Sequence, residues 1–501
     1  MRTKKALINT ISGLLYELVA VICGLILPRL ILAHFGSRYN GITSSIAQFL
    51  SCIALMKAGI GGVSRAALYQ PLADGDRQKI SSIVKTTQQF MNKIAYLFVG
   101  FIVIFSVVYS FFMSKDFSPI FTATLVVIIS ISTFGEYFFG ITYEILLGAD
   151  QMLCVFSWIR IFTTILNTIV AAILISMDCG IHAVKLGSAL VFLINPLFIR
   201  WYARRKYKII DNVEADNKLL SQRWDAVGHE VANFVNTNTD IMVLTIFANV
   251  LEVSVYTVYH TVIVGVRKVI TSFINGFGAA FGNMYAKKEM ELMEKNFRVY
   301  ELIVFSLVSI IYSITTVMFV PYAVLYTKGV TDVEYARPLF AIVISLAGAF
   351  SCIRIPYQNL VTVAGHFKQT RNGAFMEAIL NIVISVLMVI KFGLVGVAVG
   401  TLVANIFRTI QYAVYMSRNV LKRSLWLFAK HIIIMLSIIA VTNVVGRTVI
   451  NLNCDSVGKW VIGALIAGCI SLSLTVITDL AFYYADVKRF FGKLLNSVKR
   501  K

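Results

Sequence analysis

The sequence predicts an all-α integral membrane protein with about 14 transmembrane helices, because of its composition, its apolar runs and the charge of its loops. Hydrophobic residues make up 58% of the 501 residues and charged residues only 14%, whereas soluble proteins are roughly a quarter charged. Apolar runs of about 20 residues, enough to cross a hydrocarbon core of ~30 Å as a helix, recur along the whole chain. No long polar stretch separates them, so a separate soluble domain is not expected.

Charged or turn-rich segments divide the chain into the expected spans. These cover approximately 8–34, 41–66, 84–112, 119–147, 153–176, 180–201, 225–249, 253–281, 299–321, 337–362, 373–391, 393–416, 427–448 and 457–484. The first span follows a basic start, as in a signal peptide. Its apolar part is longer than ~15 residues, contains Glu17 and lacks a small-residue cleavage site, so we expect an uncleaved span. The scattered cysteines show no CxxC pairing and predict neither a disulfide framework nor a zinc site.

The basic residues lie mainly in short loops that fall on one side of the membrane. Placing the N-terminus inside puts "RTKK", "RWYARRKYK", "SRNVLKR" and the basic C-terminal tail in the cytoplasm, as the positive-inside rule requires. The sequence therefore predicts a multi-pass protein of the cell (cytoplasmic) membrane with both termini cytoplasmic. This orientation accounts for the net charge of +21, so nucleic acid is not an expected partner.

Weak internal similarity predicts two lobes built from the same helical unit. The tripeptide at 165–167 recurs at 379–381, and three further residues recur 213 positions on: Gly180, Gly187 and Arg205 as Gly393, Gly400 and Arg418. Each lobe holds six spans, an even number, so a parallel pseudo-two-fold axis along the membrane normal is expected. The predicted parts are an N-terminal six-helix lobe 1–208, a cytoplasmic linker 209–224, a C-terminal six-helix lobe 225–420, and two additional helices with a basic tail 421–501.

Ionisable side chains occur inside several predicted spans, where a charge costs ~2.5–3.5 kcal/mol even on the lenient insertion scale. The deep set is Lys57, Glu136, Arg267, Arg354 and Arg408, while Glu17 and Asp240 enter from the other side and lie nearer the middle. Asp240 shares one helical face with Asn233, Asn236 and Thr237. Charges nearer the span ends, where long side chains reach the interface, are Arg29 and Lys185 outside and Arg65, Lys93, Arg160 and Glu377 inside.

Two interpretations of the deep set remain open. The first is internal ion pairing, for example of Glu136 with Arg354 or Lys57. The second is a solvated, net-cationic cavity that holds an anion such as phosphate, whose oxygens match the planar fork of arginine. The glycines at 59, 61, 62, 276 and 278 are interpreted either as points where spans 2 and 8 bend or as sites of close helix packing.

Enzyme motifs are missing from the sequence. There is no GxxxxGK[ST] loop, no HExxH and no GxSxG elbow. We therefore expect no enzyme activity and no cofactor. A membrane polymerase or ligase is disfavoured as well, because the longest expected outer loop, about 322–336, is short. Any transport must then draw on an ion gradient or on consumption of the substrate on the far side.

Four segments together resemble polysaccharide flippases. They are "LPRLILAHFGSRYNGI" at 27–42, "KAGIGGVSRAALYQPLADGD" at 57–76, "NTDIMVLTIFANVLEVSVYTVYHTV" at 238–262 and "EAILNIVISVLMVIKFGLVGVAVGT" at 377–401. In this order the chain is similar to the O-antigen and capsule repeat-unit (Wzx-like) flippases, whose superfamily includes multidrug and toxin extruders and lipid II flippases. The resemblance implies a two-lobed, V-shaped fold whose cationic cavity opens alternately to either side.

The resemblance also implies a substrate, and by position Arg29 and Asp240 resemble the family's first-span arginine and seventh-span aspartate. The substrate is a polyprenyl-diphosphate-linked oligosaccharide carried from the inner to the outer leaflet for cell-surface polysaccharide biosynthesis. The expected cationic site is Arg29, Lys57, Arg267, Arg354 and Arg408, and the expected polar lining or ion-coupling set is Glu17, Glu136, Asn233, Asn236 and Asp240. Membrane lipids, a coupling sodium ion or proton, a polysaccharide polymerase and a chain-length regulator are the further expected partners.

Two alternatives of the same fold remain. A lipid II flippase is chemically close to the first choice and is separated from it only by sequence texture. A multidrug extruder, which exchanges a cationic drug for sodium or protons, would prefer acidic cavity residues. The excess of arginine and lysine in the deep set counts against that reading.

Overall fold

A computed structural model describes residues 2–57, 60–215, 234, 238–274 and 277–499, excepting the side chains of 2–7, 56–57, 279 and 490–499. Within these residues all regular secondary structure is helical, which confirms the predicted all-α class. The chain divides into two compact units, Met1–Asn238 and Thr239–Lys501, called here unit 1 and unit 2. The division falls after the predicted linker 209–224 and inside the predicted seventh span.

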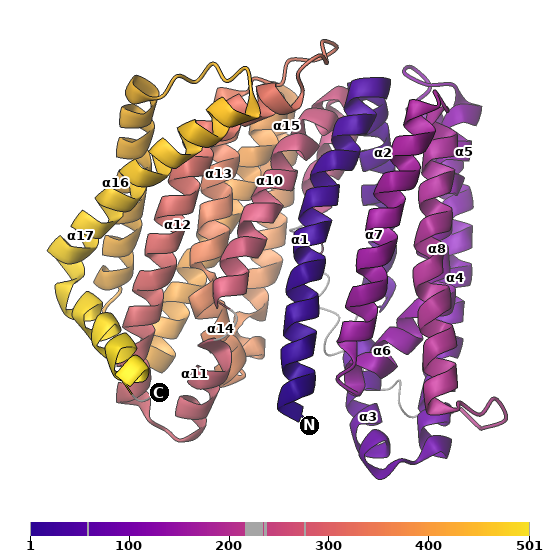
Figure 1. The fold of residues 1–501 in the computed structure, drawn as a ribbon, viewed down its shortest axis with the longest axis horizontal. Helices are drawn as coiled ribbons and strands as arrows, with labels where there is room; N and C mark the ends of the chain where they lie inside the picture. The colour runs from indigo at the N-terminus through magenta and orange to yellow at the C-terminus, as the bar shows by residue number, and fades with distance from the viewer. Residues whose placement is uncertain (1, 58–59, 216–233, 235–237, 275–276, 500–501) are drawn as a thin grey trace. The chain divides into compact units, whose positions relative to one another are not determined.

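Unit 1 is a bundle of long helices with one broken span. Its elements are α1 (Arg2–Phe35), α2 (Ser37–Leu50), η1 (Ser51–Lys57), α3 (Ile60–Asp74), α4 (Arg77–Phe112), α5 (Pro119–Gly135), η2 (Glu136–Gly140), α6 (Ile141–Ala149), α7 (Leu153–Ser176) and α8 (Ile181–Tyr207). α1 packs on α7, α7 on α8, α8 on α5 and α5 on α4 (Figure 1). Buried residues of α1, α7 and α8, among them Ile31, Ala171 and Val184, form a common core.

Local sequence explains where several of these helices begin. The carboxylate of Asp76 accepts the Lys79 N–H at 3.0 Å and caps α4, and the hydroxyl of Ser118 accepts the Phe121 N–H at 3.3 Å and caps α5. Pro119 follows that cap at the first position of the helix, where a missing N–H breaks no helical hydrogen bond. Gly36, with φ 84°, separates α1 from α2 in a conformation that costs a glycine little.

Unit 2 repeats this order and adds two helices. A short apolar helix, Asn238–Phe247, starts at the boundary between the units and lies almost entirely in unit 2. The following elements are α10 (Val250–Ile274), α11 (Phe277–Ala286), α12 (Met290–Tyr326), α13 (Pro338–Ile353), α14 (Ile355–Ala364), α15 (Phe367–Met416), η4 (Ser417–Leu421), α16 (Trp426–Val449) and α17 (Val457–Lys499). α13 packs on α15, whereas α16 and α17 both pack on α12. α17 bends at Tyr483, where φ is −135° and ψ is 25°, and the bend is visible in Figure 1.

α15 is a hairpin of two helical arms joined at a single residue. Gly393 has φ 53° and ψ −130°, which ends one arm and starts the next. The arms run back along each other, since the Ser385 hydroxyl of the first arm donates to the Val397 carbonyl of the second at 3.3 Å. Gly396 and Gly400 allow the close approach: a Cβ at Gly400 would lie 2.7 Å from the backbone nitrogen of Ser385.

The helices agree with the expected spans in position. Among the described residues, eleven helices are long and apolar enough to cross a membrane, or up to twelve if the bent pair Ser37–Leu55 and Ile60–Asp74 forms one span. α15 contains both spans expected at 373–391 and 393–416. The seventh expected span, 225–249, lies partly outside the described residues. The two helices of the bent pair, which cover the expected span 2, diverge by 52°.

The order of elements is similar in the two units, as the predicted repeat requires. α4 corresponds to α12, the pair α5–α6 to α13–α14, and α7–α8 to the two arms of α15. Matched residues occupy matching places: Gly180 precedes α8, and Gly393 precedes the second arm of α15. α16 and α17 have no counterpart among the described helices of unit 1, as expected for an appended pair.

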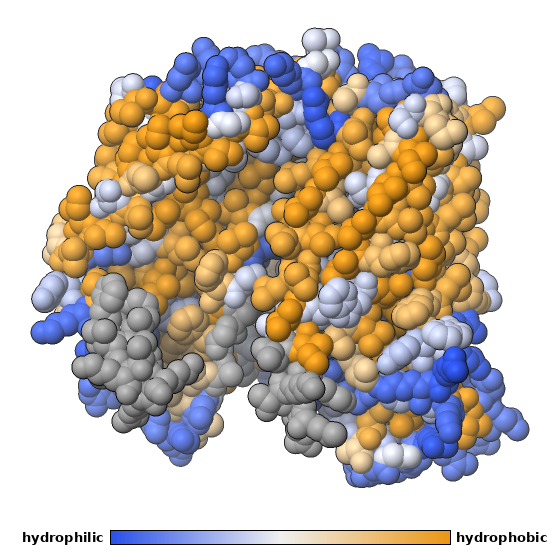
Figure 2. All heavy atoms as spheres, viewed as in Figure 1, coloured by the Kyte–Doolittle hydropathy of each residue, from blue (hydrophilic) through white to orange (hydrophobic). Residues whose placement is uncertain are grey.

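Exposed side chains are distributed as in a multi-pass membrane protein. Figure 2 shows hydrophobic residues over the middle of the helices and hydrophilic residues at their ends. Large apolar side chains are exposed away from the helix ends, for example Leu97 of α4, Ile379 of α15 and Ile477 of α17. Such surfaces are stable against hydrocarbon and costly in water.

Candidate functional site

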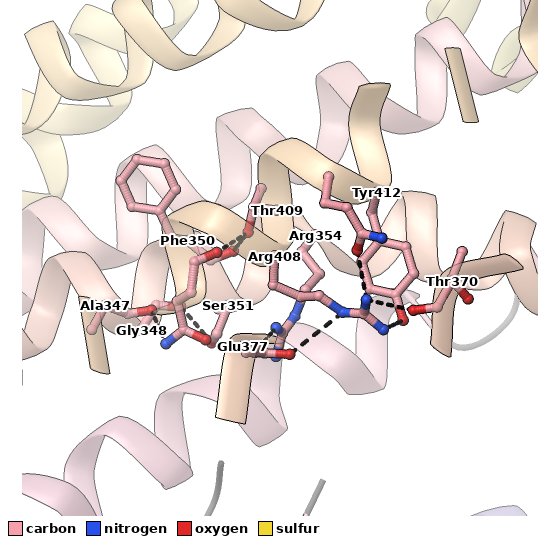
Figure 3. A network of polar contacts seen from close by, with 12 residues as sticks. Ala347, Gly348, Phe350, Ser351, Arg354, Thr370, Glu377, Arg408, Thr409 and Tyr412 are labelled. Atoms are coloured by element: carbon pink, nitrogen blue, oxygen red, sulfur yellow. Dashed lines mark hydrogen bonds and ion pairs between the residues drawn. The ribbon is translucent and has the colours of Figure 1, made fainter. Parts of the chain in front are cut away.

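The centre of unit 2 holds an ion-paired triad of Arg354, Glu377 and Arg408 (Figure 3). Nη1 of Arg354 lies 2.5 Å from Oε1 of Glu377, and Nε of Arg408 lies 3.4 Å from Oε2 of the same carboxylate. All three side chains are less than a tenth exposed. One carboxylate is therefore shared by two guanidinium groups, so the triad carries a net positive charge inside the helical bundle.

Three separate helical pieces bring the triad together. Arg354 stands at the break between α13 and α14, where Pro356 lacks the N–H that a continuous helix would need. Glu377 lies on the first arm of α15 and Arg408 on the second. The turn at Gly393 sets them level, because Glu377 is 16 residues before it and Arg408 is 15 residues after it.

The guanidinium of Arg408 is held by further acceptors. Nη1 donates to the Thr370 carbonyl at 2.8 Å and to Oε1 of Gln411 at 2.5 Å. Nη2 donates to the Tyr412 hydroxyl at 2.6 Å, and the guanidinium carbon lies 4.0 Å from the centre of the Tyr412 ring. Arg408 is thus fixed in place by its own arm and the facing arm of α15 (Figure 3).

Hydrogen bonds between α13 and the second arm of α15 fix the register of the triad. The Asn405 amide donates to the Ala347 carbonyl at 3.2 Å, and the Thr409 hydroxyl donates to the Phe350 carbonyl at 3.0 Å. Both acceptors lie one to two turns before Arg354. Figure 3 shows these neutral contacts beside the ion pairs of the triad.

Arg267 of α10 adds a third guanidinium to this region. Its charge interacts with those of Arg354 and Glu377, yet its side chain is exposed whereas the triad is buried. The sequence placed Arg267 deep in a span, and an exposed arginine at that depth requires water or a counter-ion rather than lipid. Three arginines against one glutamate make this surface of unit 2 suitable for an anion.

A second polar site surrounds Asp240 at the start of unit 2. The Tyr256 hydroxyl donates to Oδ2 of Asp240 at 2.8 Å, and the Thr401 hydroxyl donates to the same oxygen at 2.7 Å. Asn381 also contacts the carboxylate, and the Ser385 hydroxyl donates to Oδ1 of Asn381 at 3.1 Å. Asp240 is 5% exposed. In the part of the chain that the structure describes, its recorded partners are all neutral.

A third buried site, around Glu301 of α12, was not predicted from the sequence. Glu301 is fully buried; Nη2 of Arg423 lies 2.7 Å from its Oε2, and the Tyr357 hydroxyl donates to its Oε1. His431 lies 4.0 Å from the same carboxylate and stacks on the ring of Tyr483, at the bend of α17, with centroids 4.4 Å apart. This site ties α12 and α14 to the start and the bend of the appended pair.

The candidates of unit 1 form looser contacts. Glu136 lies in η2 and is 3.9 Å from Arg160, and their side chains are 42% and 31% exposed. Such a pair contributes little. Glu17 and Arg29 are both half-buried on α1. Of the other expected site residues, the side chain of Lys57 and all of Asn233 and Asn236 lie outside the described residues.

The recorded ion-pair partner of Glu136 is Arg160, and that of Arg354 is Glu377. The expected pairing of Glu136 with Arg354 or Lys57 stays a prediction, because Arg354 belongs to the other unit and the side chain of Lys57 lies outside the described residues. Glu377 was expected near the inner surface with its end reaching the interface, but it is 6% exposed and bridges two arginines. In the described residues, no three His, Cys, Asp or Glu side chains cluster as metal ligands would.

The fold and these buried charges define a many-helix membrane protein with a polar interior. Its fold is that of the solved lipid II flippase MurJ in an inward closed conformation, with a TM-score of 0.68 and 15% identity over 96% of this chain and all of that chain. An inward-facing multidrug resistance MATE family transporter of the MOP superfamily gives a TM-score of 0.62 and 12% identity over 82% of this chain and 98% of its own.

A third structure, of the MATE multidrug transporter DinF-BH, gives a TM-score of 0.58 and 15% identity over 84% of this chain and 97% of its own. At such low identities the TM-scores establish the fold alone, and the expected all-α membrane fold is confirmed. No model of a known protein family matches the chain, and no curated protein matches it either.

Proposed function

We propose that the protein is a flippase or exporter, and not an enzyme, that moves a polyprenyl-diphosphate-linked oligosaccharide from the inner to the outer leaflet by alternating access. The observation that carries the proposal is the exposed Arg267 next to the buried triad of Arg354, Glu377 and Arg408. The fold shared with a lipid II flippase supports the same class of substrate.

The charge balance of this surface favours a diphosphate over a cation. Among the described residues, the acid recorded in this region is Glu377, which is bound to two arginines, so with Arg267 three guanidinium groups share one carboxylate. Arg267 is left to bind an exogenous anion, and its planar fork matches two phosphate oxygens. In this proposal the triad provides a fixed net positive charge near the site. Arg267 contacts the diphosphate, and the polyprenyl tail remains in the bilayer.

We further propose that Asp240 couples transport to an ion. A buried carboxylate whose recorded partners are neutral is stabilised further when it is protonated or holds a cation. The oxygens of Asp240, Thr401 and Asn381 provide hard ligands of the kind that a sodium ion prefers to nitrogen or sulfur. Sodium or proton binding there and diphosphate binding near Arg267 would use different residues of unit 2.

Two other functions share the fold. A lipid II flippase would use the same diphosphate chemistry and differ in the sugar. A multidrug extruder of cationic compounds, as in the MATE structures of similar fold, is disfavoured by the excess of arginine around Arg354 and Arg267. In the proposed cell-surface pathway, a polymerase and a chain-length regulator would receive the translocated units.

The experiment is leaflet translocation of a fluorescent polyprenyl-diphosphate oligosaccharide in vesicles that contain the purified protein. Arg267→Gln is compared with Arg447→Gln, a matched loss of an exposed arginine on α16. We expect Arg267→Gln to slow translocation at least roughly tenfold, the loss of one charge-assisted hydrogen bond, and Arg447→Gln to retain it. Equal rates in the two variants would refute the diphosphate role. Efflux of a cationic dye without lipid translocation would favour the extruder.

Lipid II presented in the same vesicles distinguishes the remaining alternative. Preference for an oligosaccharide without the peptide would support the polysaccharide substrate. Preference for lipid II would assign the protein to peptidoglycan precursors, with the same role for Arg267.

A further inference from the structure

A small groove in unit 1 lies between α4 and α8, where α8 ends and the chain continues toward unit 2. It has a volume of about 150 Å³ and is lined by Lys85, Arg200, Arg204 and Asp211, among others. This volume is several times the ~30 Å³ share of one water molecule, so the groove has room for a small hydrated or anionic group.

The lining carries three basic side chains and one acid. Nη2 of Arg204 donates to both carboxylate oxygens of Asp211, to Oδ1 at 2.6 Å and to Oδ2 at 2.5 Å. The Lys85 ammonium donates to the backbone carbonyls of Asp211 and Val213 at 3.3 and 2.8 Å. For Arg200 the recorded contact is the ring of Phe139, 5.3 Å from the guanidinium carbon. No ion pair of Arg200 is recorded among residues 2–57, 60–215, 234 and 238–499 as far as these are described.

The acid belongs to a strap, residues 209–214, that α4 holds across the groove. Besides the Lys85 contacts, the Ser82 hydroxyl donates to the Glu214 carbonyl at 2.6 Å, and the Ile210 N–H donates to the Ser81 hydroxyl at 3.0 Å. These bonds use the backbone of the strap. They therefore remain when the Asp211 side chain turns away, so the carboxylate is replaceable without release of the strap.

The ion pair between Arg204 and Asp211 stabilises the groove only weakly, so another anion can replace the Asp211 carboxylate. The Asp211 side chain is 77% exposed and that of Arg204 34%, and pairs exposed to this degree contribute about 0–1 kcal/mol. A phosphate group would bring three acceptor oxygens and up to two charges to the same fork. It would also reach Arg200, which the carboxylate leaves without a recorded ion pair.

We propose that this groove is a binding site for a phosphate or diphosphate group, in which the Asp211 carboxylate is a displaceable internal stand-in for the anion. Arg204 supplies the bidentate contact, and Arg200 and Lys85 supply the additional positive charge. The Tyr143 side chain, also in the lining, is buried and limits the depth of the site. The site is formed by unit 1 alone and does not depend on the transport proposed from unit 2.

The test measures binding of two probes by the purified full-length protein in nanodiscs of neutral lipid. One probe is inorganic diphosphate, titrated calorimetrically, and the other is farnesyl diphosphate incorporated in the bilayer. Binding of the soluble probe identifies a site for free phosphates. Binding of only the farnesyl probe identifies a lipid headgroup site of the same chemistry.

Three variants are expected to change the affinity for the probes in three different ways: one tightens binding, one weakens it and one leaves it unchanged. Asp211→Asn removes the stand-in and is expected to tighten binding roughly two- to fivefold, the affinity equivalent of an exposed ion pair. Arg204→Gln is expected to weaken binding roughly tenfold or more. Arg205→Gln is the matched control, because that neighbouring guanidinium lies over the ring of Trp201, 5.7 Å away, outside the groove lining.

Misfolding does not imitate this pattern, since a tighter complex in Asp211→Asn requires an intact site. The proposal is overturned if neither probe binds, if Asp211→Asn does not tighten binding, or if Arg204→Gln and Arg205→Gln lose affinity equally. None of these outcomes bears on translocation by Arg267→Gln, so the two proposals fail separately.

Discussion

Glu377 and Arg354 approach to 2.5 Å in the centre of unit 2, and the same carboxylate also contacts Arg408. Buried ion pairs of this kind contribute little net free energy when complete, because desolvation offsets the attraction. Removing one member is different, since it leaves a buried charge without compensation. The triad therefore makes unit 2 sensitive to the loss of its one acid.

Glu377→Gln is expected to destabilise the protein by about 3–5 kcal/mol, because two buried guanidinium groups lose their shared counter-ion. The measurement is thermal unfolding in detergent, followed by helical circular dichroism. Glu334→Gln is the control, as Glu334 is exposed in the connection before α13. Unfolding of the two variants at the same temperature would show that the triad is hydrated and not truly buried.

The second prediction concerns the contact of Glu301 with Arg423 at the appended pair of helices. Each single change, Glu301→Gln or Arg423→Gln, should destabilise by about 3–5 kcal/mol, and the double variant by less than the sum. A double-mutant cycle measures the coupling, expected at about 0.5–3 kcal/mol. Glu252 and Arg337, 3.1 Å apart but partly exposed, form the comparison cycle, for which coupling of only about 0–1 kcal/mol is expected. Similar coupling in the two cycles would contradict the special role of burial at Glu301.

The third prediction tests the one-residue turn of α15. Gly393→Ala should cost about 1–3 kcal/mol, because a side chain disfavours the positive φ at this position. Gly180, at the matching place in unit 1, has φ −61° and open space around it. Gly180→Ala should therefore change the free energy of unfolding by no more than about 0.5 kcal/mol. Unfolding midpoints of the two variants check this difference. A harmless Gly393→Ala would mean that the arms are connected in another conformation.

The fourth prediction concerns ion coupling at Asp240. Asp240→Asn removes the charge while keeping the size, so transport should lose its dependence on sodium or on the proton gradient, whichever drives the wild type. Translocation rates are measured with sodium varied at fixed pH and with pH varied without sodium. Asp455→Asn, a loop carboxylate that is exposed, is the control. Unchanged ion dependence in Asp240→Asn would remove this residue from the coupling mechanism.

The sequence predicted the spans well because periodic hydrophobicity and punctuation by charge are local signals. The ends of α7, expected at 153 and 176, agree with Leu153–Ser176. The break at Arg354 was less evident, since Pro356 inside an apolar run indicates a kink without giving its consequence. The internal repeat added long-range information, and Gly180 with Gly393 marked two equivalent corners.

The candidate site was predicted only in part. Arg354, Arg408 and Arg267 were noticed because each interrupts an apolar run. Glu377 lies near a predicted span end, and Glu301 follows a charged segment. The sequence therefore contains no sign that either charge is buried at a cost in free energy. Their partners are distant along the chain: Arg423 is 122 residues from Glu301. Such pairings depend on helix packing, which the local pattern does not encode.

The single-residue turn at Gly393 also constrains how unit 2 is made by the cell. Two helices joined by one residue have no connecting loop to translocate separately. They are therefore expected to enter the membrane together as a hairpin, already packed against each other. Arg408 then enters hydrocarbon beside Glu377 as a neutralised pair, which lowers the insertion cost that each charge has alone. The turn in α15 thus links the biogenesis of the protein to the ion pair at its centre.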